Sequence, residues 1–423
     1  MDFKKKVLKN QIRLLTASLP QSQTANILVM FKVGSRYESN KFHGASHFVE
    51  HLMFKGTKKR PDTLSLSKVL DGVGAEFNAF TNRDYTGYYI KADAKNLSLA
   101  IDVLSDMLLN SKFEAKEIEK EKGVIVEEIN MYEDNPLMYV EELLEQAMFT
   151  DNPLSHSVAG DRKSVRAFSR KDLAGYRDSF YTGKNTVISL AGKFDKDHLK
   201  EISSKFSFVS GKGINKFKRI KLKQKSPRVV IKYKDTEQTQ LALGLPAYSY
   251  LNPKAYALQL LSVILGGNMS SRLFLNVREK RGLAYFVRSW PNFYEDCGNL
   301  IIQSGLDKSR IEEAIKVILA ELLKLKKGVR TDELKRAKDY LVGRAKIDLE
   351  DTESLAQWYA SQELFTRKVL TPEEKYKKIM AVSLKEVDAV AKEVVDLKKT
   401  TLALIGPFKE EKRFKKIIYE NRD

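Results

Sequence analysis

Two histidines and a glutamate in the stretch Gly44–Thr57 have the types and the spacing of a metal site. His47 and His51 are four positions apart, so on a helix their imidazoles lie one turn apart on one face, with Glu50 beside them. Proteins bind zinc through neutral imidazole nitrogens and carboxylates, and a catalytic site leaves one position to water. The metal lowers the pKa of that water toward about 7, and a neighbouring carboxylate can accept its proton. The pattern H-x-x-E-H therefore predicts a zinc ion with its own general base, Glu50.

A third ligand is needed to support this prediction, because two surface histidines can stand four positions apart by chance. The acidic, helix-favouring run 119–129 supplies carboxylates at Glu119, Glu121, Glu127 and Glu128. Glu121 and Glu128 are two turns apart and share one face of a helix, whereas Glu127 points elsewhere. The residues alone leave both Glu121 and Glu128 as candidates for the third ligand.

The order and spacing of these motifs resemble the pitrilysin family of inverted-motif zinc peptidases, above all its short-chain branch. The family includes insulin-degrading enzyme and mitochondrial processing peptidase. Its third ligand is a glutamate about 75 residues after the second histidine, and another glutamate seven residues earlier supports the site. Here 76 residues lie between His51 and Glu128, and Glu121 precedes Glu128 by seven. The resemblance implies one Zn²⁺ per chain on His47, His51 and Glu128, with Glu50 as general base and Glu121 as a supporting catalytic residue.

The segments 75–80 and 84–91 have the composition of two strands joined by a turn, and an ordinary hairpin is the simplest interpretation. The resemblance implies a more specific role for the first strand. In the family, the matching edge strand carries an Asn-Ala pair, here Asn78 and Ala79, that lines the cleft and pairs with the backbone of the substrate. An exposed strand edge offers unpaired N–H and C=O groups to an extended peptide.

A second functional motif lies in 266–285, where glycines and serines precede an expected helix Arg272–Arg281. Taken alone, this segment predicts a capped surface helix, because glycine and serine are common at the start of helices. In the pitrilysin family an arginine and a tyrosine seven residues apart contact the substrate carbonyl, and Arg278 and Tyr285 have that spacing. A guanidinium and a phenol can both donate to a carbonyl oxygen and to the oxyanion it becomes. The resemblance therefore implies that Arg278 and Tyr285 bind substrate.

The length and composition predict a globular protein of two domains. A chain of 423 residues is too long for one ordinary core, and 43% hydrophobic residues suffice to build two. No run approaches the roughly 20 apolar residues of a membrane span, and the basic N-terminal segment lacks the apolar core of a secretory signal. The single cysteine, Cys297, excludes an internal disulfide and fits a reducing compartment. We therefore expect a cytoplasmic protein without membrane contact.

A net charge of +19 makes nucleic acid the first alternative partner, because such a charge attracts anions over long distances. The lysines and arginines are spread through amphipathic segments, and the sequence contains no zinc finger, RNA-binding sheet motif or other recognised module. We expect a lysine-rich surface and no nucleic-acid binding.

The second half of the chain repeats the pattern of the first. A basic stretch without acidic residues, 211–228, divides the chain, and similar strands and helices then recur in the same order. No metal ligand recurs near position 261, so the second copy keeps the fold without the metal. The predicted division is an N-terminal zinc-binding domain, a basic linker and a metal-free homologous domain with the Arg/Tyr pair, at 1–208, 209–228 and 229–423.

The predicted fold class is α+β, with two homologous domains that each have a mainly antiparallel sheet flanked by helices. The resemblance implies that the two domains form half of a clamshell, since long-chain members enclose a chamber with four such domains. The other half must then come from another subunit. Because one chain carries both motifs, we expect a homodimer, with a heterodimer with a metal-free homologue as the alternative.

The predicted function is that of a zinc endopeptidase that hydrolyses unstructured peptides or presequence-like segments inside the dimer chamber. The alternative is a non-catalytic scaffold or partner subunit of the same fold, as the family also contains such proteins. These proteins typically lose the metal residues, whereas this chain has the full set. The sequence does not name the substrate or the cleavage site.

Overall fold

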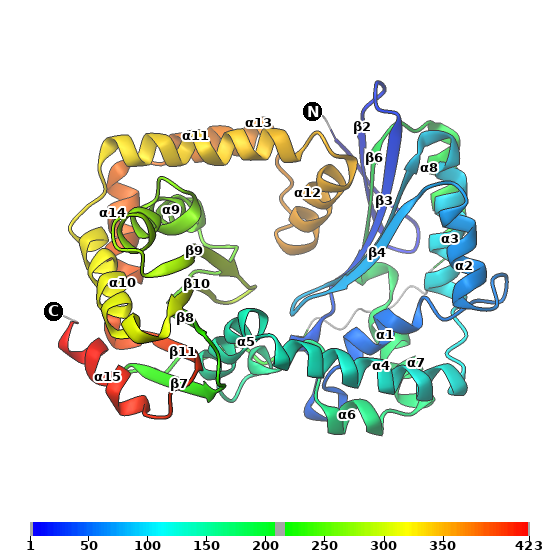
Figure 1. Ribbon diagram of the computed structural model, residues 1–423. Coiled ribbons are helices and arrows are strands. Elements are labelled where there is room, and N and C mark those ends of the chain that lie inside the picture. The colour runs from blue at the N-terminus through cyan, green and yellow to red at the C-terminus, as the bar shows by residue number, and fades with distance from the viewer. Residues whose placement is uncertain (1–2, 208–215, 422–423) are drawn as a thin grey trace. The chain divides into compact units, whose positions relative to one another are not determined.

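Two compact units make up the described part of the chain, which covers residues 3–207 and 216–421 of this computed structural model (Figure 1). Each unit has its own sheet and its own buried core. The first unit comprises the chain up to Asn130 together with His156–Lys218 and Ala345–Glu374. The second unit comprises Met131–Ser155, Arg219–Arg344 and the chain from Lys375 onward.

The sheet of the first unit has six strands in the order β1-β2-β6-β3-β5-β4. Neighbouring strands are antiparallel except for β2 and β6, which run parallel. The strands are β1 (Lys4–Val7), β2 (Arg13–Ser18), β3 (Thr24–Phe31), β4 (Glu76–Thr81), β5 (Thr86–Asp93) and β6 (Thr186–Gly192).

The sheet of the second unit has five strands in the order β7-β11-β8-β10-β9. Only β7 and β11 are parallel. This is the strand order of the first sheet without β1, with β7 to β11 in the places of β2 to β6, so the predicted α+β class and the predicted duplication are confirmed. The strands are β7 (Arg228–Tyr233), β8 (Gln238–Ala247), β9 (Ala284–Phe293), β10 (Gly298–Asp307) and β11 (Thr401–Gly406).

Helices connect and cover the strands, and several begin at an aspartate or serine whose side chain accepts from the first-turn amides, such as Asp161 and Ser383. Within the described ranges, no helix combines the length and the apolar character that crossing a membrane requires. The helices are α1 (Ala45–Leu52), α2 (Thr63–Asp71), α3 (Leu97–Asn110), α4 (Ala115–Asp134), α5 (Pro136–Met148), α6 (Arg162–Ala167), α7 (Arg170–Phe180), α8 (Lys196–Lys205), α9 (Ala255–Ser262), α10 (Ile311–Lys326), α11 (Thr331–Asp348), α12 (Thr352–Phe365), α13 (Pro372–Ala381), α14 (Leu384–Val394) and α15 (Glu411–Glu420).

The central strand β3 is apolar on both faces, so both faces of the first sheet must be covered. Successive side chains of a strand point to opposite faces. Ile27 and Val29 pack into the core formed with α1 and α3, whereas Leu28 and Met30 pack against Tyr359 of α12. In Figure 1, α12 lies on one side of this sheet and α3 and α8 lie on the other. The first unit is therefore a sheet between two helical layers.

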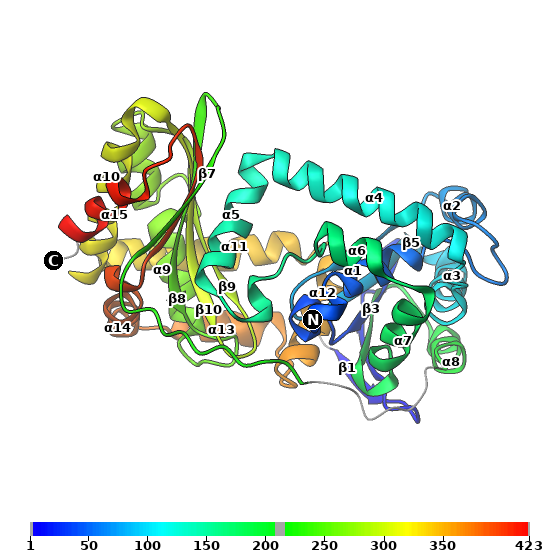
Figure 2. The same cartoon turned by 90° about the horizontal axis from the view of Figure 1, so that it is seen from below.

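The second sheet is covered in the same way, with α9 and α14 on one face and α5 on the other (Figure 2). Val140 and Leu144 of α5 pack against Ala242 and other residues of that face. Gly244 of β8 allows α5 to pack close to the sheet, because a Cβ at this position would lie 2.4 Å from the sulfur of Met148 in α5. The helix that covers this face precedes the second sheet in sequence by about 80 residues, and α12, which covers the first sheet, follows that sheet.

The compact units therefore differ from the expected contiguous division at 208 and 229. The segment 131–155 belongs to the second unit, and 345–374 belongs to the first. The physical reason is that the strands bury apolar residues on both faces, while the helices nearest in sequence cover only one. Of the predicted linker 209–228, residues 209–215 lie outside the described residues, 216–227 form no helix or strand, and Arg228 begins β7.

A buried ion-pair cluster fixes α12 on the first sheet. Glu363 of α12 is fully buried, and its carboxylate accepts from Lys5 Nζ at 2.7 Å and lies 3.3 Å from Arg13 Nε. Lys5 and Arg13 belong to β1 and β2. A charge at this depth is stable only with a partner, so the cluster sets the position of α12 more strictly than apolar packing alone.

Candidate metal centre

The predicted ligands come together from two helices of the first unit. His47 and His51 project from one face of α1, and Glu128 projects from α4. The two Nε2 atoms are 3.2 Å apart. Glu128 Oε1 lies 3.6 Å from His47 Nε2, and Glu128 Oε2 lies 3.4 Å from His51 Nε2. Within the described part of the chain, these three residues are the only group of three potential ligands whose donor atoms converge in this way.

These distances fit a tetrahedral zinc ion. Zinc bonds to nitrogen and oxygen are about 2.0–2.2 Å long, so two ligand atoms of a tetrahedron are roughly 3.3–3.5 Å apart. The two Nε2 atoms are 3.2 Å apart, and each lies 3.4–3.6 Å from one of the two Glu128 oxygens. Two imidazoles and one carboxylate are also the donor set of hydrolytic zinc sites that keep an open position.

Glu121 and Glu128, which share one face of α4, have different positions relative to His51. Glu121 is buried; its Oε1 accepts from His51 Nδ1 at 2.8 Å, and its Oε2 forms an ion pair with Lys55 Nζ at 2.7 Å. A carboxylate on Nδ1 fixes the tautomer and orientation of the ring so that Nε2 faces the metal. The structure therefore places Glu128 among the ligand atoms and Glu121 behind His51, in the supporting position expected from the resemblance.

The electrostatics of the site favour positive charge. Burial disfavours the imidazolium of His51, but hydrogen bonds to Glu121 and Glu128 outweigh it and raise the pKa of His51 to about 9. Burial likewise works against ionisation of Glu128, but the hydrogen bonds from His47 and His51 hold its pKa well below the usual value. A divalent cation bound between these side chains would balance the negative charge of Glu121 and Glu128.

Glu50, the predicted base, lies on α1 beside the ligands and makes a hydrogen bond that the sequence did not suggest. Thr81, the last residue of β4, donates its hydroxyl to Glu50 Oε2. Burial raises the pKa of Glu50, while His47 and the Thr81 hydroxyl oppose that rise. A partly buried carboxylate with a raised pKa and a fixed orientation is suited to accept a proton. Thr81 therefore positions the base.

Replacing Thr81 by valine is expected to lower kcat for peptide hydrolysis about 10- to 100-fold. Valine keeps the shape of threonine but removes the hydroxyl, and a hydrogen bond to a charged group is worth about 1.5–3 kcal/mol. Thr81→Ser keeps the hydroxyl and should remain within about twofold of the wild type. Steady-state kinetics of the two variants provide the comparison, and equal kcat values for Thr81→Val and the wild type would contradict the positioning role.

Asn78 and Ala79 lie on β4, which is an edge strand paired with β5 and packed beside α1. The Ala79 amide donates to the Asn78 side-chain oxygen at 2.8 Å. Asn78 is exposed, so an incoming peptide carbonyl can take over the amide of Ala79 when the Asn78 side chain turns away. The structure thus places Asn78 and Ala79 on a sheet edge beside the metal helix α1. The role of these two residues in substrate binding stays a prediction.

Arg278 and Tyr285 lie close together in the second unit. Arg278 belongs to a π-helical turn, Phe274–Glu279, inside the expected helix, and its guanidinium lies 5.9 Å from the ring centre of Tyr285. Tyr285 occupies the extra position of a β-bulge, because the register of β9 and β10 shifts between Gly305 and Leu306. Both irregularities are frequent at functional sites.

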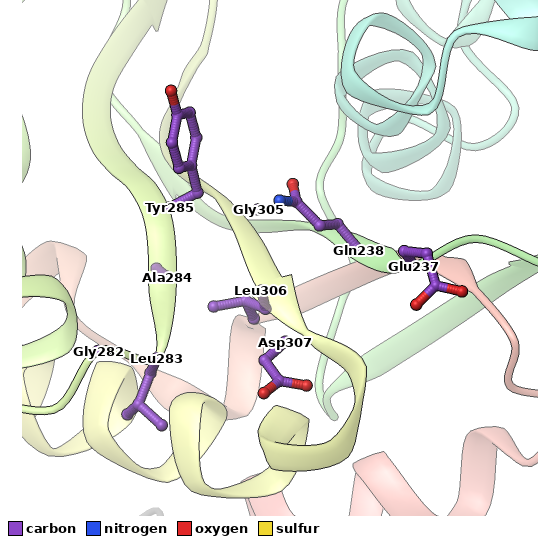
Figure 3. A pocket seen from close by; sticks show the side chains of 9 residues that line it. All are labelled: Glu237, Gln238, Gly282, Leu283, Ala284, Tyr285, Gly305, Leu306 and Asp307. Carbon is purple, nitrogen blue, oxygen red and sulfur yellow. The ribbon is translucent and has the colours of Figure 1, made fainter.

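Tyr285 also lines a pocket of about 350 Å³ in the second unit (Figure 3). The tyrosine ring extends from β9 away from the pocket residues Leu283 and Asp307, and the side chain is 74% exposed. The phenol is therefore free to donate to a ligand. The other lining residues are Glu237, Gln238, Gly282, Ala284, Gly305 and Leu306.

The duplicated α+β fold with one H-x-x-E-H helix defines the class of inverted-motif metallopeptidases. Residues 13–162 match the family model described as insulinase (peptidase family M16), and residues 167–341 match the model described as the peptidase M16 inactive domain. The chain belongs to this insulinase family, which confirms the resemblance drawn from the motifs.

Known proteins similar to this chain include an uncharacterized zinc protease of Bacillus subtilis, YmxG, which is 34% identical over 96% of this chain and 98% of that protein. An uncharacterized zinc protease of Streptomyces coelicolor is 34% identical over 95% of this chain and 89% of that protein. The crystal structure of a protease from Helicobacter pylori superposes with a TM-score of 0.88 at 22% identity, over 96% of this chain and 99% of that chain. The similarity to the Helicobacter pylori structure shows that this chain shares its two-unit fold.

Proposed function

We propose that this protein is a zinc-dependent endopeptidase that hydrolyses unstructured peptides or presequence-like segments. The observation that carries the proposal is the convergence of His47, His51 and Glu128 at the ligand separations of zinc, with Glu50 beside them. Bound there, zinc supplies a Lewis acid that polarises the scissile carbonyl and acidifies water. The family and the zinc-protease names of its relatives support the same class of reaction.

Each proposed site residue has one task. Glu50 accepts a proton from the attacking water and returns it to the leaving amine, and Thr81 holds its carboxylate in place. The free edge at Asn78 and Ala79 aligns the peptide backbone as an added strand. Arg278 and Tyr285 donate to a carbonyl oxygen of the substrate and stabilise the negative charge that develops on it. This arrangement recognises main chain and demands an extended peptide, which a folded substrate does not offer.

Removal of the metal tests the proposal. A quenched fluorescent peptide should be cleaved by the purified protein, and a chelator should abolish cleavage until zinc is restored in equal amount to the chain. Glu128→Gln should bind zinc at least about tenfold more weakly than the wild type, because it loses a charged ligand. A purified chain that holds no stoichiometric zinc and cleaves no peptide would instead favour the non-catalytic scaffold or partner subunit.

We further propose that the protein works as a homodimer. The metal ligands belong to the first unit and Arg278 and Tyr285 belong to the second, so one sequence can supply both parts of a shared site. A two-fold dimer of such chains has two equivalent sites, each completed by the partner subunit. A heterodimer with a metal-free homologue is the alternative.

A further inference from the structure

Glu38 is a buried carboxylate beside the metal helix with no part in the proposed chemistry. Its side chain is only 3% exposed and lies in the turn after the 3₁₀ segment Ser35–Tyr37. Glu38 Oε2 accepts from the Gly44 amide at 2.7 Å, and Oε1 accepts from the Ser46 amide at 2.8 Å. Backbone amides only donate, so both oxygens accept. Burial raises the pKa of Glu38 to about 8, and the hydrogen bonds from the Ser46 and Gly44 amides oppose that rise.

These two bonds satisfy two of the amides at the N-terminus of α1, which has no side-chain cap of its own. The N-cap residue of α1 is Gly44, at φ 91°, and it offers no side chain to the orphan amides of the first turn. A larger residue does not fit, because a Cβ at Gly44 would lie 2.7 Å from the Cα of Gly160. The close approach of the two glycines therefore removes the usual cap, and Glu38 replaces it from outside the helix.

The position of His47 depends on this first turn. His51 is oriented through its second nitrogen by Glu121, but among the described residues nothing hydrogen-bonds the buried Nδ1 of His47. Ligating histidines ordinarily have such a partner, which holds the ring in place. His47 follows Ser46 directly, and α1 has only eight residues, so the backbone of this turn sets where the imidazole lies.

We propose that Glu38 is a positioning residue of the metal centre, which holds His47 in ligating position through the Gly44 and Ser46 amides. The inference rests on the proposed function only in taking the metal at His47, His51 and Glu128 to be zinc. Ser46 is fixed from a second side, because its hydroxyl lies 2.8 Å from the hydroxyl of Tyr176 on α7. Glu38 thus does for His47, through the backbone, what Glu121 does for His51 through a side chain.

Glu38→Gln tests the proposal, with Glu145→Gln as the matched control. The amide keeps the size of the side chain but places an NH₂ group against one of the two amides. Glu145 is equally buried, at 3% exposure, and accepts from Tyr294 Oη at 2.5 Å and Asn299 Nδ2 at 2.9 Å in the second unit. The measurement is the zinc dissociation constant by competition with a chromogenic chelator, together with kcat and KM for a peptide.

Glu38→Gln should raise the zinc dissociation constant about 10-fold or more and lower kcat with little change in KM, since a lost supporting contact typically costs 10- to 100-fold in metal affinity. Glu145→Gln should lower the melting temperature but leave zinc affinity within about twofold. If Glu38→Gln keeps wild-type zinc affinity and kcat while losing stability as the control does, Glu38 is merely structural and the proposal fails.

Hydrogen exchange of the wild type provides the second measurement if Glu38→Gln does not fold. The amides of Gly44 and Ser46 should be protected in the zinc-loaded protein, and rapid exchange at both would overturn the capping role. A wild type that binds no zinc overturns the proposed function, and with it the positioning role. Peptide cleavage that depends on zinc in the wild type, combined with unchanged zinc affinity in Glu38→Gln, overturns the role of Glu38 alone.

Discussion

Glu50→Gln is expected to lower kcat for peptide hydrolysis by about 10²- to 10⁴-fold, the range that general acid–base catalysis contributes. The amide has the size of the carboxylate and can still accept the Thr81 hydroxyl, but it cannot take a proton from water. The ligand atoms of His47, His51 and Glu128 are untouched, so the variant should still bind one zinc ion per chain. Kinetics on a quenched peptide and metal analysis of the same preparation check both statements.

Glu127→Gln provides the control for this result. Glu127 lies on α4 next to Glu128, but it is exposed and points away from the ligand atoms. The control removes the same charge at a similar place in the chain and should leave both kcat and zinc binding close to wild-type values. Cleavage by Glu50→Gln at the wild-type rate, with metal still bound, would show that another group accepts the proton.

The two histidine ligands could be predicted because their arrangement depends on local geometry. Spacing on one helix brings His47 and His51 to one face whatever the rest of the fold does. The choice between Glu121 and Glu128 was different, since both share a face of α4 and the residues alone left it open. The structure separates them through Lys55 and His51 Nδ1, which hold Glu121 behind the ligand.

Thr81 and Glu38 could not be predicted, because their roles depend on where a side chain points in three dimensions. In the sequence Thr81 falls in the turn between the two predicted strands, and its partner Glu50 is 31 positions away. Glu38 stands in a turn, and its role depends on the contact of Gly44 with Gly160 far along the chain. The one sequence feature that bears on the role of Glu38 is Gly44, because a glycine at the start of a helix leaves the first turn without a side-chain cap.

The duplicated sheets could be predicted from recurring strand patterns. The sequence did not indicate that α5 covers the second sheet and α12 covers the first. Apolar residues on both faces of β3 indicate that two layers must cover it, but they do not say which helix forms the second layer. An amphipathic helix fits any apolar face of the right size. For α12 the position is set by Glu363, whose partners Lys5 and Arg13 are more than 340 positions away.

A mixture of Glu50→Gln and Arg278→Ala chains is expected to recover activity that neither variant has alone. If each site takes its metal residues from one chain and its Arg/Tyr pair from the partner, a mixed dimer has one site with both Glu50 and Arg278 intact. Equal amounts with free subunit exchange make half of the dimers mixed, so about one quarter of the sites should be active. The measurement is peptide cleavage before and after subunit exchange, with dimer formation followed by light scattering.

A mixture of Glu50→Gln and Glu128→Gln chains is the matched control. Both changes lie in the metal half of the site, so no combination of these chains restores a complete set, and activity should stay at the level of the single variants. Recovery in the first mixture but not in the second requires sites that are shared between subunits. An active monomer would contradict the homodimer. Exchanged dimers of the first mixture that stay inactive would contradict sites shared between the two subunits and leave a site within one chain.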